Sequence, residues 1–243
     1  MNMKAFKIAA LVAILVCIAP AYAQNIQLHY DLGRHIYNED EPQRQYVTAT
    51  LEQFKADRLG SWHYFVDLDL RSRGMSGAYA EISREFTLKK DKPWAAHVEF
   101  DGGLNCGGSF QHAALFGPAY NWHNSDFSRT WSLQALYKQY FAGNDLDAVS
   151  SFQLTTVWAI NFCKSKLTFS GFADLWYGYR PRWAASGRQC KGLVFITEPQ
   201  FWYNIIPKLS VGTEWELSNN FVYPASTHRK FFVNPTIAVK VNL

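Results

Sequence analysis

The chain has 243 residues, a formal net charge of +4, and 18% charged against 16% aromatic residues. So few charges with so many aromatic residues exclude a disordered chain, because such chains lack the apolar mass found here. Beyond the N-terminus no run of ~18 apolar residues occurs, which excludes a bundle of membrane-spanning helices but not a membrane β-barrel, and the small net charge gives no electrostatic case for binding nucleic acid.

Residues 1–23 have the features of a secretory signal peptide. Lys4 and Lys7 form a basic end, residues 8–20 are largely apolar, and Ala21-Tyr22-Ala23 is a small-x-small cleavage site. We expect the mature chain to start at Gln24 and residues 24–243 to form a single domain. Cys17 offers a lipoprotein alternative, but the preceding Val16 is bulkier than the small residue that lipoprotein processing usually needs.

Period-two alternation of apolar and polar residues then recurs along the whole chain, with Gly, Pro, Asn and Asp between the segments. Residues 62–71 show it most clearly, because Trp62, Tyr64 and Val66 alternate with His63, Phe65 and Asp67. A helix would spread this pattern over all its faces, whereas a strand places it on one dry and one wet face. Roughly twelve such strands are expected, near 25–34, 45–56, 62–71, 77–88, 94–103, 110–121, 128–141, 149–162, 166–180, 192–203, 208–218 and 230–242.

Strand length and loop length favour an all-β, antiparallel, up-and-down transmembrane β-barrel. Most of the expected strands have ten or more residues, as a tilted strand crossing an outer membrane requires, whereas strands of soluble proteins average ~5–6 residues. Connections after even-numbered strands are short and several after odd-numbered strands are long, so short turns and long loops segregate to opposite ends. A secreted β-sandwich is the alternative, and it explains neither feature. Pro199 and Pro235 fall on the dry face within strands, and each predicts either a β-bulge or a strand register different from the one assigned here.

In such a barrel the wet face of each strand lines a lumen. Carboxylates there can cross-link a wet interior, while aromatic rings on the same face can stack on a flat solute as carboxylates accept bonds from its hydroxyl groups. The candidate lumen-lining and solute-binding residues are Phe65, Asp67, Asp69, Arg71, Tyr79, Glu81, Ser83, Glu85, Glu99, Asp174, Trp176, Glu198 and Trp202.

One of these strands carries a family resemblance. The stretch from Tyr79 to Leu88, with Glu81, Ser83 and Phe86, is similar to the Y-x-E-F-S-x-x-F-S-L strand of the Tsx-like nucleoside-specific channel-forming proteins of the bacterial outer membrane. The resemblance implies a twelve-stranded barrel that passes nucleosides by diffusion through weak, aromatic-lined sites, with Tyr79, Glu81 and Ser83 facing the lumen. Arg84-Glu85 stands where that family tends to have Pro-Arg.

An enzyme is the main alternative to a channel. His123-Asn124-Ser125, followed by Ser128-Arg129, looks faintly like outer-membrane phospholipase A, another twelve-stranded barrel with His and Ser two residues apart. Ser132 stands where that family supplies Asn, and His123 falls at the expected periplasmic turn rather than near the outer leaflet. We therefore expect a loop-capping role for these residues and no catalytic residue.

The remaining expectations concern partners and covalent links. Cys106 and Cys190 fall in expected outward loops of an exported chain and are candidates for a disulfide, which would leave Cys163 free. No motif for a metal or a cofactor is recognised. The sequence therefore predicts a monomeric, non-enzymatic channel in the outer membrane of a Gram-negative-type bacterium, with both termini periplasmic, lipid as its surroundings and a small nucleoside-like solute as cargo. A closed structural or surface-binding barrel without transport is a third possibility.

Overall fold

The computed structural model describes residues 24–37, 44, 47–71, 74–105, 108–109, 111–143, 147–180, 190–222 and 229–243. The predicted signal peptide and Cys106 lie outside these residues, as does the side chain of Cys190, so the cleavage site and the disulfide stay predictions. Cys163 is an exposed free thiol in the turn after residue 162. No helix in the described parts is long and apolar enough to cross a bilayer.

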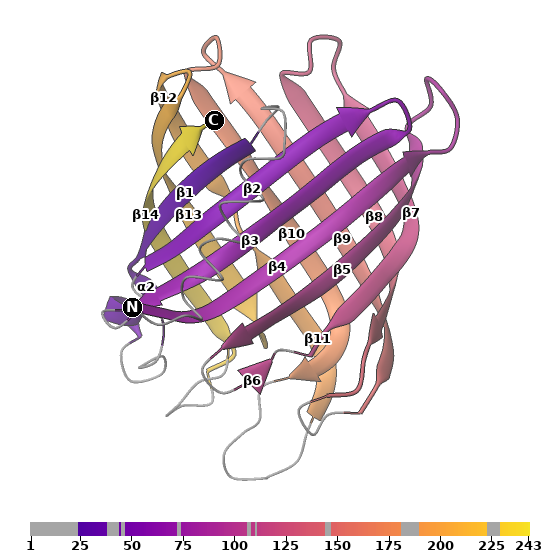
Figure 1. Cartoon of the computed structure of the whole chain (residues 1–243), viewed down its shortest axis with the longest axis vertical. Coiled ribbons are helices and arrows are strands. Elements are labelled where there is room, and N and C mark those ends of the chain that lie inside the picture. Colours follow the sequence, from indigo (N-terminus) through magenta and orange to yellow (C-terminus); the bar gives the residue numbers. More distant parts are fainter. Residues whose placement is uncertain are drawn as a thin grey trace, which may run out of the picture.

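Strands dominate the described chain (Figure 1). They are β1 (Gln24–Asp31), β2 (Val47–Asp57), β3 (Gly60–Arg71), β4 (Gly74–Thr87), β5 (Trp94–Asn105), β6 (Gly108–Ser109), β7 (Ala113–His123), β8 (Arg129–Tyr140), β9 (Val149–Phe162), β10 (Leu167–Arg180), β11 (Cys190–Thr197), β12 (Gln200–Ile206), β13 (Leu209–Asn219) and β14 (Phe231–Asn242), with one short helix, α2 (Gly33–Ile36).

These strands form one closed antiparallel ring. Each long strand pairs with its neighbour in sequence, and the ring closes through β1 with β14, where Tyr30 lies opposite Ile237. β11 and β12 both pair with β10 and β13 and act as one barrel strand, while β6 pairs with β5 alone. In the described residues the fourteen strand segments of the sheet therefore make a barrel of 14 − 2 = 12 strands, and the predicted fold class is confirmed.

The two prolines do not produce the expected bulges. Around Pro199 the pairs Ala173–Thr197 and Ser170–Gln200 keep the same register, so the ladder skips the proline without inserting a residue. The skip is tolerated because the flanking groups still pair: the Glu198 N–H donates to Phe172 O at 3.1 Å, and Pro199 O accepts from Trp215 N at 3.0 Å. Pro235 likewise lies opposite Trp215 in an unshifted register.

The register does shift elsewhere, between Asn204 and Ile206 in β12 and between Asp69 and Leu70 in β3. The first strand also ends earlier than predicted. Asp31 Oδ1 accepts the Gly33 N–H at 2.6 Å and starts α2. Gly33 is required there because a Cβ atom would lie 2.2 Å from Asn234 Oδ1.

The two ends of the barrel differ. The connections β2–β3, β4–β5, β7–β8, β9–β10 and β12–β13 lie at one end, the turn end, together with Gln24 and Leu243, whose backbones hydrogen-bond at 3.0 Å. The connections β1–β2, β3–β4, β5–β7, β8–β9, β10–β11 and β13–β14 lie at the other, the loop end, and all of them except the short β3–β4 connection are longer than those at the turn end. This is the segregation expected of a membrane barrel.

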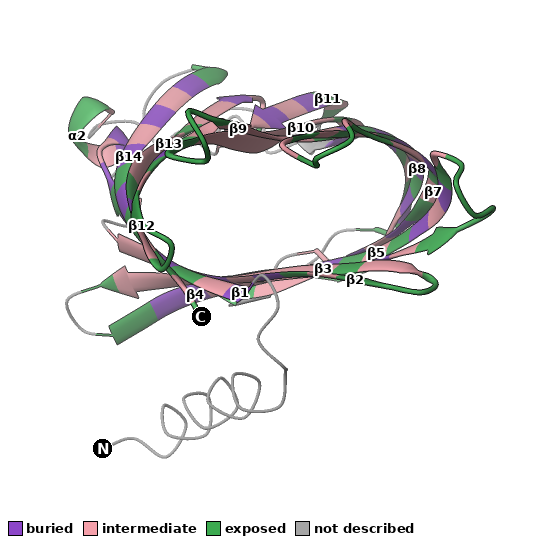
Figure 2. Ribbon diagram, turned by 90° about the horizontal axis from the view of Figure 1, so that it is seen from above, coloured by how far each residue is buried: buried purple, intermediate pink, exposed green. Residues whose placement is uncertain are grey.

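The outer face is apolar and exposed. Leu28 (51%), Phe152 (53%) and Ile237 (62%) keep large fractions of their surface uncovered. Such side chains occur on nearly every strand, whereas monomeric soluble proteins rarely expose a contiguous apolar surface of this kind. Figure 2 shows the opposite face enclosed by the ring. Most ionisable residues of the strands lie on this inner face, the one that forms the candidate site.

Candidate functional site

Contacts between strands that are not neighbours identify the inner face. Lys138 Nζ on β8 lies 3.1 Å from Asp101 Oδ2 on β5, with β7 between them. Such a contact is possible only across the concave side of the barrel. Directly opposed residues share a face, so the register carries this assignment from strand to strand. It puts all the predicted lumen residues on the inner face: Phe65, Asp67, Asp69, Arg71, Tyr79, Glu81, Ser83, Glu85, Glu99, Asp174, Trp176, Glu198 and Trp202.

Three carboxylates meet on the inner face of β4 and β5. One oxygen each from Glu81, Glu99 and Asp101 lie within 4.8 Å of one another. Tyr79 donates its hydroxyl to Glu81 Oε1 at 2.7 Å. On β3, beside this group, Asp67 accepts a hydrogen bond from a threonine hydroxyl at 2.5 Å. Antiparallel pairing brings these acids together because Glu81 lies opposite Asp101 in the register.

More carboxylates lie on the facing wall. Asp174 on β10 interacts electrostatically with Glu81 and Glu99, and Glu198, between β11 and β12, interacts with Asp67 and Glu81. Figure 2 shows the reason, since the ring is flattened, with β2, β3 and β5 along one long side and β9 and β10 along the other. The middle of the lumen is therefore acidic on both sides.

Towards the loop end the acids are paired. Arg44, from the β1–β2 connection, donates to Asp31 Oδ2 at 2.8 Å and to Glu216 Oε2 at 2.9 Å. All three side chains are mostly covered, at 19%, 12% and 12% exposure. Arg44 could not be predicted from the sequence, because a residue between strands has no alternation to show which face it joins. The two ion pairs fix Arg44 to the inner wall.

Towards the turn end Glu85 is the centre of a neutralising network. Its oxygens lie 3.3 Å from His97 Nδ1, and accept from Asn121 Nδ2 at 2.6 Å and from Gln134 Nε2 at 3.4 Å. These partners come from three further strands, β5, β7 and β8, and the network therefore ties four strands together. Glu85 is thereby held as a structural group rather than left free in the lumen.

The aromatic rings of the inner face differ in accessibility. Phe65 packs against Tyr79 with ring centroids 6.0 Å apart, and both remain partly exposed. Trp176 is also partly exposed, and the Lys138 ammonium lies 5.2 Å from its ring. Trp202 is 1% exposed because Lys240 lies 3.9 Å above its ring. A flat solute could therefore stack on Phe65, Tyr79 or Trp176. At Trp202 the Lys240 side chain covers the ring and prevents such stacking.

One stretch of the inner wall is apolar. Ala113, Leu115 and Leu136 form a buried cluster against which Tyr140 packs. The register places Leu115 opposite Glu99 and Lys138, so this cluster belongs to the inner face. This cluster could not be predicted from the sequence, because a few apolar residues at inner-face positions do not break the alternation of apolar and polar residues.

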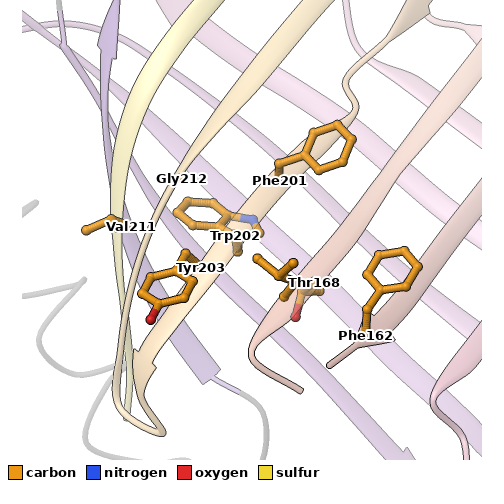
Figure 3. Close-up of a pocket in the computed structure, with 8 residues that line it drawn as sticks. Phe162, Thr168, Phe201, Trp202, Tyr203, Val211 and Gly212 are labelled. Carbon is orange, nitrogen blue, oxygen red and sulfur yellow. The ribbon is translucent and has the colours of Figure 1, made fainter. Parts of the chain in front are cut away.

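A hollow of about 260 Å³ lies in the wall between β9, β10, β12 and β13 (Figure 3). Apolar residues of the outer face, such as Phe201 and Tyr203, provide most of its lining, with 54% and 51% of their surface exposed. Gly212 contributes to the space, because it has no side chain. A lining of this kind suits an acyl chain better than a hydrophilic solute.

Residues of the lipase alternative lie in the β7–β8 turn. His123 Nδ1 lies 2.9 Å from Asn124 O, and its ring stacks on Phe127 at 3.9 Å. Asn124 Oδ1 accepts the Arg129 N–H at 2.9 Å, as a turn-capping side chain does. The His123 imidazole is thus held by contacts with Asn124 and Phe127 of the same turn.

Taken together, a closed antiparallel barrel with an apolar exterior and an ionisable interior defines a porin-like membrane β-barrel. The chain belongs to the family described as "Domain of unknown function (DUF5020)", whose model matches residues 23–243. No curated protein matches the sequence.

Similar solved structures include porins and another outer-membrane protein. The NanC porin matches with a TM-score of 0.56 at 10% identity, covering 91% of this chain and 99% of that one. The KdgM porin matches with 0.49 at 9% identity over 91% and 99%. Omp33 of Acinetobacter baumannii matches with 0.42 at 12% identity over 92% and 99%. For the NanC porin, at 10% identity, the likeness concerns the fold alone.

Proposed function

We propose that the protein is a passive channel for small hydrophilic solutes in the outer membrane of a Gram-negative-type bacterium. The observation that carries this proposal is the closed ring with an apolar outer face and carboxylates on both walls of its interior. An exterior of this kind requires lipid, and a barrel in lipid with a polar interior is the architecture of a porin. The protein would act as a monomer and would have no catalytic activity.

The orientation follows from the difference between the two ends. In outer-membrane barrels short turns and both termini face the periplasm, while long loops face outward. By this rule the turn end, with Gln24 and Leu243, is periplasmic. The group formed by Arg44, Asp31 and Glu216 would then lie towards the outward-facing end, from which a solute enters.

Nucleosides are the proposed cargo. A nucleoside has a flat base, which can stack on a partly exposed ring such as Phe65, Tyr79 or Trp176, and sugar hydroxyls, which can donate to neighbouring carboxylates such as Asp67. The ring–acid arrangement supports this, as does the resemblance of the Tyr79–Leu88 strand to Tsx-like channels. Acidic walls also favour cations over anions.

Single-channel conductance in a planar bilayer tests the proposal. We expect an open channel that selects cations in a salt gradient and that millimolar adenosine or thymidine partly blocks. Phe65→Ala should weaken the block, whereas Phe116→Ala, an outer-face change (55% exposed), should leave it unaltered. A conducting barrel that nucleosides do not block would refute the cargo, and a folded barrel without conductance would refute the channel.

A further inference from the structure

The carboxylates of Glu81, Glu99 and Asp101 have the spacing of a calcium site. Their nearest oxygens all lie within 4.8 Å of one another. Ca²⁺ holds its oxygen ligands at about 2.3–2.6 Å, so two ligands on opposite sides of the ion are up to roughly 5 Å apart. Mg²⁺, with bonds of about 2.0–2.1 Å, would require a spread of no more than roughly 4.2 Å. A spread of up to 4.8 Å is therefore within the reach of Ca²⁺ bonds.

A second observation is independent of this spacing. Asp101 is 5% exposed, and its Oδ1 atom is buried with no hydrogen-bond partner. From the facing wall, the Oδ1 atom of Asp174 is likewise buried and without a hydrogen bond, and Asp174 interacts with both Glu81 and Asp101. A buried acceptor left unpaired is costly, and a bound cation is one of the few partners that such an oxygen accepts.

The partners of this cluster do not neutralise it. Lys138 compensates Asp101 through its Oδ2 atom at 3.1 Å. His97 Nε2 lies 3.2 Å from Glu99 Oε2, while the other ring nitrogen, Nδ1, lies 3.3 Å from Glu85 Oε1. Glu81 accepts only the neutral hydroxyl of Tyr79 at 2.7 Å among the contacts described. Three carboxylates and one ammonium leave about two negative charges, which one divalent cation balances.

We propose that Glu81, Glu99 and Asp101 bind one calcium ion on the inner wall, with Asp174 facing it from β10. The ion supplies the positive charge that the neighbouring side chains lack and gives the unpaired oxygen of Asp101 a partner. Binding would tie β4 to β5 and lower the negative charge at the middle of the lumen. This site does not depend on the identity of the cargo.

Terbium luminescence tests the site in the refolded barrel in detergent at neutral pH. Tb³⁺ replaces Ca²⁺ at oxygen sites, and Tyr79, hydrogen-bonded to Glu81, lies close enough to sensitise its emission. We expect saturable emission on excitation near 280 nm with one ion per chain, displaced by Ca²⁺ at lower concentration than by Mg²⁺. Asp101→Asn and Glu81→Gln should each weaken Ca²⁺ binding about tenfold or more, because each removes one of three charged ligands.

Glu52→Gln is the matched control, because Glu52 is also an inner-face carboxylate, on β2, outside the cluster. It should bind Ca²⁺ as the unaltered protein does. Heat-modifiable gel mobility shows which variants fold, and thermal unfolding of the unaltered protein with and without Ca²⁺ gives a readout that needs no variant. Equal binding by all variants would mean unspecific attraction of cations to an acidic lumen, and no effect of millimolar Ca²⁺ on emission or unfolding would mean no site. Either result overturns the inference, without bearing on conductance.

Discussion

Replacing Lys138 by Met should destabilise the barrel strongly, because the change leaves Asp101 without its counter-charge. The two charged atoms are 3.1 Å apart and both side chains are 8% exposed. With an effective dielectric constant of about 20, Coulomb's law gives an attraction of roughly 5 kcal/mol at this distance. Breaking one side of a buried pair costs about 3–5 kcal/mol in measured cases. The lost hydrogen bond to Gln153 Oε1, at 2.8 Å, adds to the effect. We expect the free energy of unfolding to fall by about 3 kcal/mol.

A double-mutant cycle measures the pair itself. Lys138→Met, Asp101→Asn and the double variant are unfolded in urea from lipid vesicles and followed by tryptophan fluorescence. The double variant should lose about 2 kcal/mol less than the two single losses added together, since removing both charges leaves neither one unpaired. Lys166→Met, in the exposed β9–β10 turn, should change little. A coupling energy below about 0.5 kcal/mol would refute the argument that this pair is buried and electrostatically strong.

Three further changes test other parts of the wall. Gly212→Ala should prevent normal heat-modifiable mobility, because a Cβ atom would lie 2.2 Å from a backbone carbonyl oxygen, whereas Gly143→Ala, with nothing within 4 Å, should migrate normally. Arg84→Gln should lower the urea midpoint modestly and leave conductance unchanged, because the guanidinium lies between two outer-face rings at 5.0 and 5.1 Å and pairs with an exposed turn carboxylate; altered ion selectivity would contradict its outward placement. The backbone N–H of Ser128 donates to Asp126 at 3.1 Å and lowers the pKa of that carboxyl below its usual 3.8. A lowered folded-state pKa stabilises the turn above pH 3.8, and this effect is lost as the pH falls through the folded value. The protection factor of the Ser128 amide, which is its exchange rate corrected for the intrinsic pH dependence of exchange, should therefore fall only in that acid range; a fall near neutral pH would argue against this.

The strands were predictable because each one is read from its own residues. Alternation in 149–162 fixes both the limits of β9 and the face of each side chain. The same rule failed at residues 32–34, since Asp31 diverts the chain into α2 through a hydrogen bond that alternation does not encode. A second expectation failed at Pro199, where the proline indicated a bulge. The ladder kept its register there because the neighbouring backbone groups found partners.

The candidate site was predictable only as a list of inner-face residues. The alternation within each strand places Glu81 and Glu99 on the inner face. Whether their carboxylates lie close together depends on the register between β4 and β5, which the sequence of a single strand does not specify. Contacts across the lumen are even harder to predict from the sequence. Glu198, for example, faces Glu81 from the opposite side of a flattened ring. No local pattern in the sequence encodes that cross-section.

The flattening also separates two kinds of acidic residue in this barrel. Near its ends, acids such as Glu85 and Glu216 lie beside amide, imidazole or guanidinium groups that satisfy them, so they act as cross-links of the wall. At mid-height the two long walls oppose each other with carboxylates, and Lys138 offsets only part of that charge. Like charges facing each other are unfavourable for folding. The uncompensated carboxylates at mid-height are therefore the groups that a permeating solute or a bound cation would stabilise most. For this reason the proposed nucleoside binding and the proposed calcium site both lie at that level of the lumen.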